Sequence, residues 1–135
     1  MRIRRPQGNP AVLAVLRSPA HRLLSGMVIE LRYTGRRSGR QYILPVQYAR
    51  AGDRLVVVPQ AADSKMWWRN FLTEQPVTVR LAGQLHEGSA RVVTRDDPGW
   101  EEDRRLYGSR WRRLADRLTG PLVEITVRPE NDAVR

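Results

Sequence analysis

The sequence predicts an α+β fold in which six antiparallel strands form a small barrel and helices are few. Three observations predict it. Successive segments between residues 27 and 128 alternate apolar and polar residues with a period of two, which is typical of half-buried strands. Turns that contain glycine join several of these segments, as antiparallel neighbours require. Helical spacing extends over one long stretch, residues 96–118.

Length and composition set further limits. The chain has 135 residues, 41% of them hydrophobic, and no cysteine. A chain of this length forms one domain with a real core, because it buries roughly two-thirds of its unfolded surface. Disorder, a membrane-spanning helix, a disulfide framework and a cysteine nucleophile are excluded. We expect a cytoplasmic protein with one domain at residues 18–129, after a basic tail and short helix at 1–17 and before a tail at 130–135.

Two short helices are predicted near the N-terminal end. Asn9-Pro10 is typical of a helix start and predicts a helix over residues 11–17, and Ser18-Pro19 repeats this signal for residues 20–24. The apolar run before Arg17 is too short for a signal peptide. We favour packing of these helices on the protein's own core, with contact to a membrane surface as the alternative.

The next segment predicts a hairpin. Residues 27–34 and 42–48 alternate as two strands do, and the loop between them is bounded by glycines. Pro45 lies inside the second strand. Because proline cannot donate a hydrogen bond to a sheet, we expect an edge position or a bulge there.

The middle of the chain predicts three more strands and a helix. A short strand at residues 54–59 is apolar on both faces, and residues 77–81 and 85–94 form an antiparallel pair. Between the first strand and this pair, we expect a helix over residues 65–72.

A longer helix precedes the sixth strand. Asp96-Asp97-Pro98 opens it and Gly120-Pro121 ends it, before a strand at residues 122–128. One face carries an apolar stripe made by Trp100, Tyr107, Trp111, Leu114 and Leu118. Acidic residues come early in this helix and arginines come late, an order that complements the helix dipole and needs no ligand.

The charge is strongly positive. The net charge is +10, and 23 of the 24 basic residues are arginine. Residues 1–50 hold ten arginines and a single acid, Glu30. Such an excess indicates an anionic partner: nucleic acid, anionic lipid or a small molecule with phosphate or carboxylate groups. The preference for arginine over lysine also fits a bias in genome composition.

The residues that most catalytic sites need are missing from this sequence. His21 and His86 have no metal-ligand spacing, no serine triad can be assembled, and the glycine-bounded loop is not a Walker A motif. We therefore predict no metal site. If the protein is an enzyme, the reactive group belongs to a cofactor that the protein positions.

Two segments could hold such a cofactor. The loop Gly35-Arg36-Arg37-Ser38-Gly39-Arg40 combines three guanidinium groups, a hydroxyl and two glycines, which favours anion binding over a merely solvated hairpin tip. In the second segment, Trp67 and Phe71 share a helical face while Trp68 points elsewhere, so that one tryptophan is a candidate for a pocket wall.

These two segments carry a family resemblance. Residues 33–40 with Pro45, and residues 66–70 with the strand at 76–79, resemble in order and spacing two blocks of the deazaflavin-dependent nitroreductase family. The resemblance covers residues 18 to 128, nearly the whole chain. It implies a six-stranded antiparallel split β-barrel related to flavin-binding oxidoreductases. It also implies coenzyme F-420, an 8-hydroxy-5-deazaflavin whose tail carries a phosphate and glutamates.

The resemblance implies a site and an activity as well. The implied cofactor-binding residues are Arg36, Arg37, Ser38, Arg40, Pro45, Val46, Pro59, Gln60, Met66, Trp67 and Asn70. Trp68 and Tyr107 would border a substrate pocket, although the apolar stripe favours a core position for Tyr107. The expected reaction is hydride transfer from the reduced coenzyme to a small electrophilic acceptor (an enone, quinone or nitro compound), with no catalytic side chain.

Other functions stay open. The same fold could bind FMN, haem or a fatty acyl chain. A barrel that binds single-stranded nucleic acid is less favoured, on arginines interleaved with aromatic residues as in a stacking groove: Arg32, Arg36, Arg37, Arg40 and Arg69 with Tyr42, Tyr48 and Trp68. The sequence is compatible with a monomer or a homodimer, and with peripheral membrane contact through the N-terminal helices.

Overall fold

The computed structural model describes residues 10–23, 26–59 and 66–128. The chain divides into two compact units. The first unit comprises residues 1–47, 76–88 and 128–135, and the second unit comprises residues 48–75 and 89–127. The domain limits at residues 18 and 129 stay a prediction.

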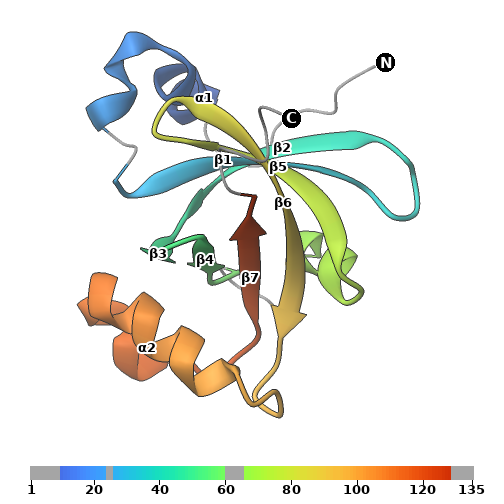
Figure 1. Ribbon diagram of the computed structural model, residues 1–135, viewed down its shortest axis with the longest axis vertical. Coiled ribbons are helices and arrows are strands. Elements are labelled where there is room, and N and C mark those ends of the chain that lie inside the picture. Colours follow the sequence, from blue (N-terminus) through green and yellow to red (C-terminus); the bar gives the residue numbers. More distant parts are fainter. Residues whose placement is uncertain (1–9, 24–25, 60–65, 129–135) are drawn as a thin grey trace. The chain divides into compact units, whose positions relative to one another are not determined.

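Strands dominate the described residues (Figure 1). The strands are β1 (Val28–Thr34), β2 (Gln41–Gln47), β3 (Ala49–Ala51), β4 (Arg54–Val57), β5 (Gln75–Leu81), β6 (Gln84–Val93) and β7 (Leu122–Val127). The α-helices are α1 (Pro10–Arg17) and α2 (Trp100–Arg110), and the 3-10 helices are η1 (Pro19–Leu23), η2 (Trp67–Phe71) and η3 (Arg112–Arg117). The predicted α+β class with an antiparallel sheet is confirmed.

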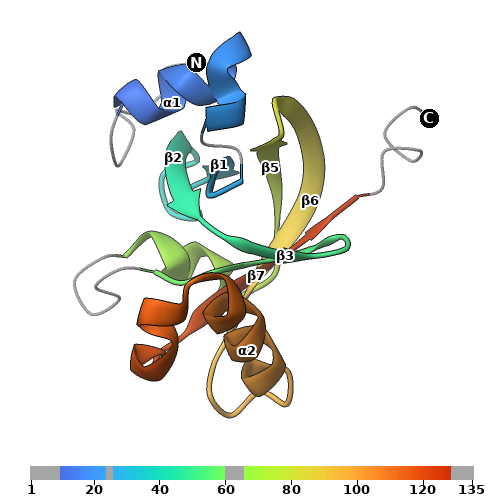
Figure 2. The same ribbon diagram turned by 90° about the vertical axis from the view of Figure 1, so that its left-hand side faces the viewer.

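The first unit contains the N-terminal helices and four strand segments. Its strands lie in the order β2-β1-β5-β6, with residues 84–88 as its share of β6. β1 and β2 pair antiparallel along their full length. α1 packs on β1 and β2, and its residues Leu13 and Leu16 are buried (Figure 2). The predicted helix therefore packs on the protein, as expected.

Two backbone features of the first unit follow from its sequence. β2 lies at the edge of the sheet, where Pro45 is tolerated, and this prediction is confirmed. The turn between β5 and β6 consists of Ala82 and Gly83, with φ values of 51° and 81°. A Cβ on Gly83 would lie 2.8 Å from Nε2 of His21, so the histidine ring packs on this turn.

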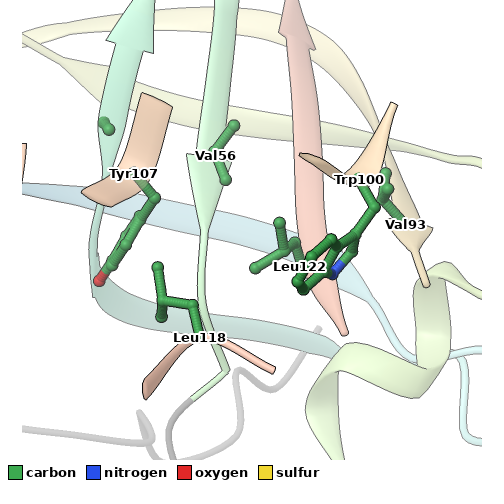
Figure 3. Packing of buried hydrophobic residues seen from close by; sticks show 7 residues of the cluster. Val56, Val93, Trp100, Tyr107, Leu118 and Leu122 are labelled. Atoms are coloured by element: carbon green, nitrogen blue, oxygen red, sulfur yellow. The ribbon is translucent and has the colours of Figure 1, made fainter. Parts of the chain in front are cut away.

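The second unit has a compact apolar core. The other part of β6 is followed in its sheet by β7, β4 and β3. Figure 3 shows its core cluster, which consists of Ala49, Val56, Val93, Trp100, Tyr107, Leu118 and Leu122. All five residues of the predicted apolar stripe lie in this cluster or pack against it. The indole N–H of Trp100 also donates to the carbonyl oxygen of Gly120 at 2.9 Å, which fixes the start of α2.

The strand count differs from the prediction. The described residues form seven strands where the sequence predicts six. The additional strand is β3, which has three residues and pairs with β4. Three residues are too few to show a period of two. The prediction of six strands is wrong by this one short strand.

The long helix predicted over residues 96–118 is interrupted. α2 ends just before Trp111, whose φ of −117° and ψ of 69° are not helical, and η3 folds back against α2 (Figure 2). Gly108 permits this return, because a Cβ there would lie 3.0 Å from the Cβ of Ala115. The indole N–H of Trp111 donates to the carbonyl oxygen of Tyr48 at 2.9 Å and holds the break in place. The prediction of one continuous helix is therefore wrong.

The helix predicted over residues 65–72 is shorter and tighter than expected. It is the 3-10 helix η2, and residue 65 lies outside the described residues. No helix in the described part of the chain is both long and apolar enough to cross a membrane.

Candidate functional site

The arginine loop, residues 35–40, forms the tip of the β1–β2 hairpin in the first unit (Figure 1). Two backbone hydrogen bonds close it: the N–H of Gly35 donates to the oxygen of Arg40 at 2.8 Å, and the N–H of Gly39 donates to the oxygen of Gly35 at 2.9 Å. Gly39 has a φ of 69°, a value that favours glycine. The loop exposes four predicted site residues, Arg36, Arg37, Ser38 and Arg40.

Aromatic rings support the base of this loop. Tyr33 and Tyr42 stack across the hairpin, with ring centroids 5.4 Å apart and planes inclined by 16°. A Cβ on Gly35 would lie 2.7 Å from Cε2 of Tyr42, so only glycine lets the chain pass this ring. The hydroxyl of Ser38 lies 3.3 Å from the Tyr42 hydroxyl and accepts the N–H of Arg40 at 3.2 Å. The rings and hydrogen bonds give the loop a defined shape.

Two further predicted residues lie on β2 in the same unit. Val46 is buried and pairs with Ile29 of β1. Pro45 is half-buried and pairs with Glu30. Backbone pairing therefore fixes both positions relative to the strands of the first unit.

In the second unit, η2 carries the aromatic block. Trp67 is buried and packs edge-to-face on Phe71, with ring centroids 6.2 Å apart and an interplanar angle of 74°. Trp68 is half-buried, and the guanidinium carbon of Arg69 lies 5.5 Å from its ring centre. The prediction that Trp67 shares a face with Phe71 is confirmed by this ring contact, and Trp68 is less buried than Trp67.

Two other residues complete this block. The side-chain amide of Asn70 donates to the carbonyl oxygen of Trp67 at 2.8 Å and so holds the turn of η2. Met66 precedes η2 and is 54% exposed, which is unusual for a large apolar side chain. An exposed methionine beside a half-buried tryptophan is a suitable wall for a flat ligand.

The remaining predicted residues of the second unit differ in accessibility. Pro59, after β4, is buried, and Gln60 lies outside the described residues. Tyr107 is fully buried in the core cluster, and its hydroxyl has no hydrogen-bond partner among the described residues. Burial raises the pKa of Tyr107 to about 12, so the phenol stays protonated. Its place agrees with the core interpretation of the stripe.

The structure therefore brings the predicted residues together as two groups, one in each unit. The first unit holds the loop arginines with Ser38, and Pro45 and Val46 on β2. The second unit holds η2 with its flanking Met66, and Pro59. No group of three or more histidine, cysteine or acidic side chains suited to a metal ion occurs within the described ranges.

Sequence reasoning missed two buried carboxylates. Glu30 on β1 and Asp103 on α2 both have 0% exposed area. A signal for Asp103 was present, because it lies three residues after Trp100 and four before Tyr107, on the apolar face of the helix. For Glu30, the sequence showed only that it is the single acidic residue among the first 50, which does not indicate burial.

Comparison with known proteins decides the family. A family model described as F420H(2)-dependent quinone reductase matches residues 15–132. The chain belongs to this family. It is accordingly an oxidoreductase that depends on reduced coenzyme F-420, as the resemblance implied. The acceptor class that the family name prints, a quinone, is one of the three expected from the sequence.

Solved structures show the same fold. One, described as a domain-swapped dimer, is 15% identical, covers 84% of this chain and 98% of its own, and has a TM-score of 0.61. A structure described as F420-H2 Dependent Reductase (FDR-A) is 15% identical, covers 73% of this chain and 92% of its own, and has a TM-score of 0.57. The haem storage protein HutZ from Vibrio cholerae is 14% identical, covers 90% of this chain and 89% of its own, and has a TM-score of 0.58.

These likenesses establish the split-barrel fold class of the reductase. At this level of sequence identity, they show that the fold is shared and do not show which ligand is bound. No curated protein matches the sequence significantly.

The arginine loop fits the coenzyme that the family uses. The tail phosphate of F-420 needs cationic forks and hydroxyl donors, and the loop presents three guanidinium groups and a hydroxyl on a closed backbone. Packing against Tyr42 requires glycine at position 35. The path of the loop is therefore constrained by the ring, as a merely solvated hairpin turn would not be. The residues of the first unit therefore suit a phosphate.

Proposed function

We propose that this reductase binds F-420 with the tail phosphate on the arginine loop and reduces a small electrophilic acceptor. A quinone is the first choice because the family is described by that acceptor. An enone and a nitro compound are the other candidates. When bound, the reduced coenzyme supplies a hydride.

The shape of the arginine loop is the observation that carries this proposal. Three like charges at a hairpin tip repel one another. Arg36, Arg37 and Arg40 nevertheless lie on a backbone closed by two hydrogen bonds and supported by the Tyr42 ring. A phosphate relieves that repulsion and accepts bidentate hydrogen bonds from guanidinium groups. Ser38 adds a neutral donor.

The ring end of the coenzyme needs a flat, apolar boundary. We propose that Met66, Trp67 and Asn70 supply one part of it, with Trp68 toward the acceptor. Trp67 is held in place by Phe71, so its ring offers a preorganised surface. Pro45, Val46, Pro59 and Gln60 are the other proposed neighbours of the ring, as the resemblance implies.

This site needs no acid or base of its own. The proposed site residues contain no carboxyl or imidazole group, and Tyr107 keeps its proton because burial raises its pKa. A proton for the reduced acceptor then comes from solvent. We expect the chemical step to vary little with pH between 6 and 8.

Binding and turnover test this function. The purified chain is titrated in parallel with F-420 and with FMN, and fluorescence of each is followed. Steady-state reduction of a quinone, an enone and a nitroaromatic compound by reduced F-420 is then measured. Saturable binding of F-420 with turnover of at least the quinone is the expected result. Binding of FMN with no response to F-420 would favour the FMN alternative.

We also propose a homodimer as the state in solution. One of the solved structures with this fold is described as a domain-swapped dimer, which favours the dimer of the two states that the sequence allows. Light scattering coupled to size exclusion gives the mass directly, against 15.6 kDa for one chain. Contact of the N-terminal helices with a membrane surface stays a prediction, and co-sedimentation with anionic vesicles tests it.

A further inference from the structure

The first unit contains an open groove that the proposed site residues do not line. Its volume is about 380 Å³. Its lining includes the polar residues Arg32, Thr34, Gln41, Thr78, Glu87 and Arg128, together with Tyr33. Thr34 and Gln41 flank the arginine loop, so the groove begins where that loop ends.

Arg32 connects the groove to a buried charge cluster. Glu30 is fully buried and lies beside three arginines: the Nε of Arg17 donates to it at 2.8 Å, the Nε of Arg32 donates to its other oxygen, and the Nε of Arg80 lies 3.6 Å away. Burial by itself would raise the pKa of Glu30, but the hydrogen bonds from Arg17 and Arg32 outweigh it and lower the pKa. The carboxylate is charged, and three cations share it.

In this arrangement, some guanidinium groups can still donate hydrogen bonds to an anion. Arg17 and Arg32 approach Glu30 through Nε, and their terminal nitrogens have no acceptor among the described residues. Arg128 pairs with Glu87 at 2.9 Å. Around Glu30 and the groove, four arginines therefore face two carboxylates. A guanidinium that is partly desolvated and lacks an acceptor binds an oxyanion more strongly than one at a fully solvated surface.

The neutral residues of the groove are also donors. Thr34, Thr78 and Gln41 line it with Arg32, and their side chains carry hydroxyl and amide groups. Hydroxyl and amide groups complete the coordination of a carboxylate or phosphate whose charge is met by arginine. A merely solvated sheet face would need neither a groove of this volume nor an arginine held by a buried carboxylate.

We propose that this groove is an oxyanion site, which binds a carboxylate or phosphate group of a small molecule through Arg32, with Thr34 and Thr78 as neutral donors. Two sources can present this chemistry: the acidic tail of the coenzyme, or a separate anionic molecule. The site itself does not depend on the proposed function, since it follows from the groove and its charges. Only the first source depends on it.

The test uses citrate and inorganic phosphate as probes on the full chain without coenzyme. Isothermal titration at low ionic strength measures the dissociation constant of each. Arg32→Gln removes the groove cation that contacts Glu30, while Arg128 stays in the groove and Glu30 keeps two arginines. Arg50→Gln is the matched control, because it removes the same charge from β3 of the second unit, outside the groove. Thr78→Val is a second variant that leaves the Glu30 cluster intact.

We expect saturable citrate binding that Arg32→Gln weakens about tenfold, since one charge-assisted hydrogen bond is lost. Thr78→Val should weaken it about threefold, and Arg50→Gln should leave it within a factor of two. Absence of saturable binding for both probes, or equal weakening by the two arginine variants, would overturn the site. If Arg32→Gln is unfolded by circular dichroism, the result for Thr78→Val decides.

Competition then identifies the source of the anion. If the coenzyme tail occupies the groove, citrate competes with F-420 but not with the tail-less deazaflavin riboside. If the anion is a separate molecule, citrate and F-420 bind together. Either result supports the oxyanion site. Failure of F-420 to bind at all would contradict the proposed function. The citrate titration would still test the oxyanion site, because it is made without coenzyme.

Discussion

The described part of each unit of this reductase buries one carboxylate, and the two carboxylates have opposite surroundings. Glu30 of the first unit and Asp103 of the second are the fully buried acids among the described residues. Glu30 has three arginines around it. Asp103 has another carboxyl group, Glu124, for a neighbour. Burial is the same at both positions, so their difference shows what the neighbouring charges do.

At Glu30, the neighbouring arginines have a larger effect on the pKa than burial does. Desolvation opposes ionisation there, but hydrogen bonds from two guanidinium groups outweigh it, and the pKa falls below its usual value. The ion pairs extend from α1 to β1 and β5, so this carboxylate ties a helix to two strands.

At Asp103 the balance is reversed. Burial and the proximity of Glu124 raise the pKa of Asp103 to about 7, because Arg54 and Arg91 compensate only in part. Nη1 of Arg54 lies 2.9 Å from Oδ1 of Asp103 but lacks the alignment of a hydrogen bond. Arg91 is divided between Glu124, at 3.2 Å, and Asp97, at 2.9 Å. The second unit thus buries an acid that is partly protonated near neutral pH.

The largest expected effect is the loss of the carboxylate that three arginines share. Glu30→Gln should destabilise the protein by about 4 kcal/mol, because it leaves three partly desolvated arginines without their buried counter-charge. Urea denaturation at pH 7 measures the change. Glu87→Gln removes an exposed carboxylate that also pairs with an arginine, and it should cost less than about 1 kcal/mol. Equal losses for the two variants would show that burial of Glu30 does not matter.

Asp103 should show a pH dependence of opposite sign. Its folded pKa is raised, so between about pH 4 and pH 7 the unfolded chain ionises first and stability falls as pH rises. Asp103→Asn removes this loss, and its stability relative to the parent should increase by about 3 kcal/mol from pH 4 to pH 8.

The matched control for this prediction is Glu102→Gln. Glu102 precedes Asp103 on the same helix and also pairs with Arg54, at 3.3 Å, but its side chain is 73% exposed. Denaturation curves at four pH values should show no pH-dependent difference between this variant and the parent. A flat difference for Asp103→Asn as well would mean that its carboxyl titrates normally.

A smaller effect is expected at the glycine that the arginine loop requires. Gly35→Ala places a Cβ 2.7 Å from the Tyr42 ring, so the loop must shift. We expect a destabilisation of about 2 kcal/mol and weaker F-420 binding, since overpacking costs about this much. Gly120→Ala in the second unit meets no atom within 4 Å and should change neither quantity. Fluorescence titration and thermal melts measure both.

Much of the first unit could be predicted from its sequence. The period of two in residues 27–34 and 42–48, with Pro45 at an edge, predicted β1, β2 and their loop. The burial of Glu30 could not be predicted, because alternation places it on the polar face with Arg32. Its cover comes from Arg17 and Arg80, which lie far away in the sequence.

The second unit was predicted less well, and the reasons are physical. β3 is too short for a periodic signal, and the break at Trp111 depends on a tertiary hydrogen bond to Tyr48. The one sequence signal for this break was Gly108, because a glycine inside a helix is compatible with close packing of another segment. The order of acids and arginines on α2 had been explained by the helix dipole. Asp103 shows that one of those acids instead faces the core.

The arginines that make up the net charge of +10 have different surroundings in the two units. Several arginines of α2 and its surroundings are neutralised locally, as in the pair of Arg104 with Glu101. The arginine loop of the first unit has no acid near it in sequence. The central claim is that this loop, and not the overall charge, binds the coenzyme.

Fluorescence titration of F-420 into two double variants tests that claim most directly. Arg36→Ala with Arg37→Ala removes two loop arginines, and Arg112→Ala with Arg113→Ala removes two exposed, consecutive arginines from η3. The loop variant should lose about 3 kcal/mol of binding free energy, more than a hundredfold in affinity, at about 1.5 kcal/mol per charged hydrogen bond. The η3 variant should bind within about threefold of the parent. Unchanged affinity in the loop variant, or equal losses in both, would contradict the assignment.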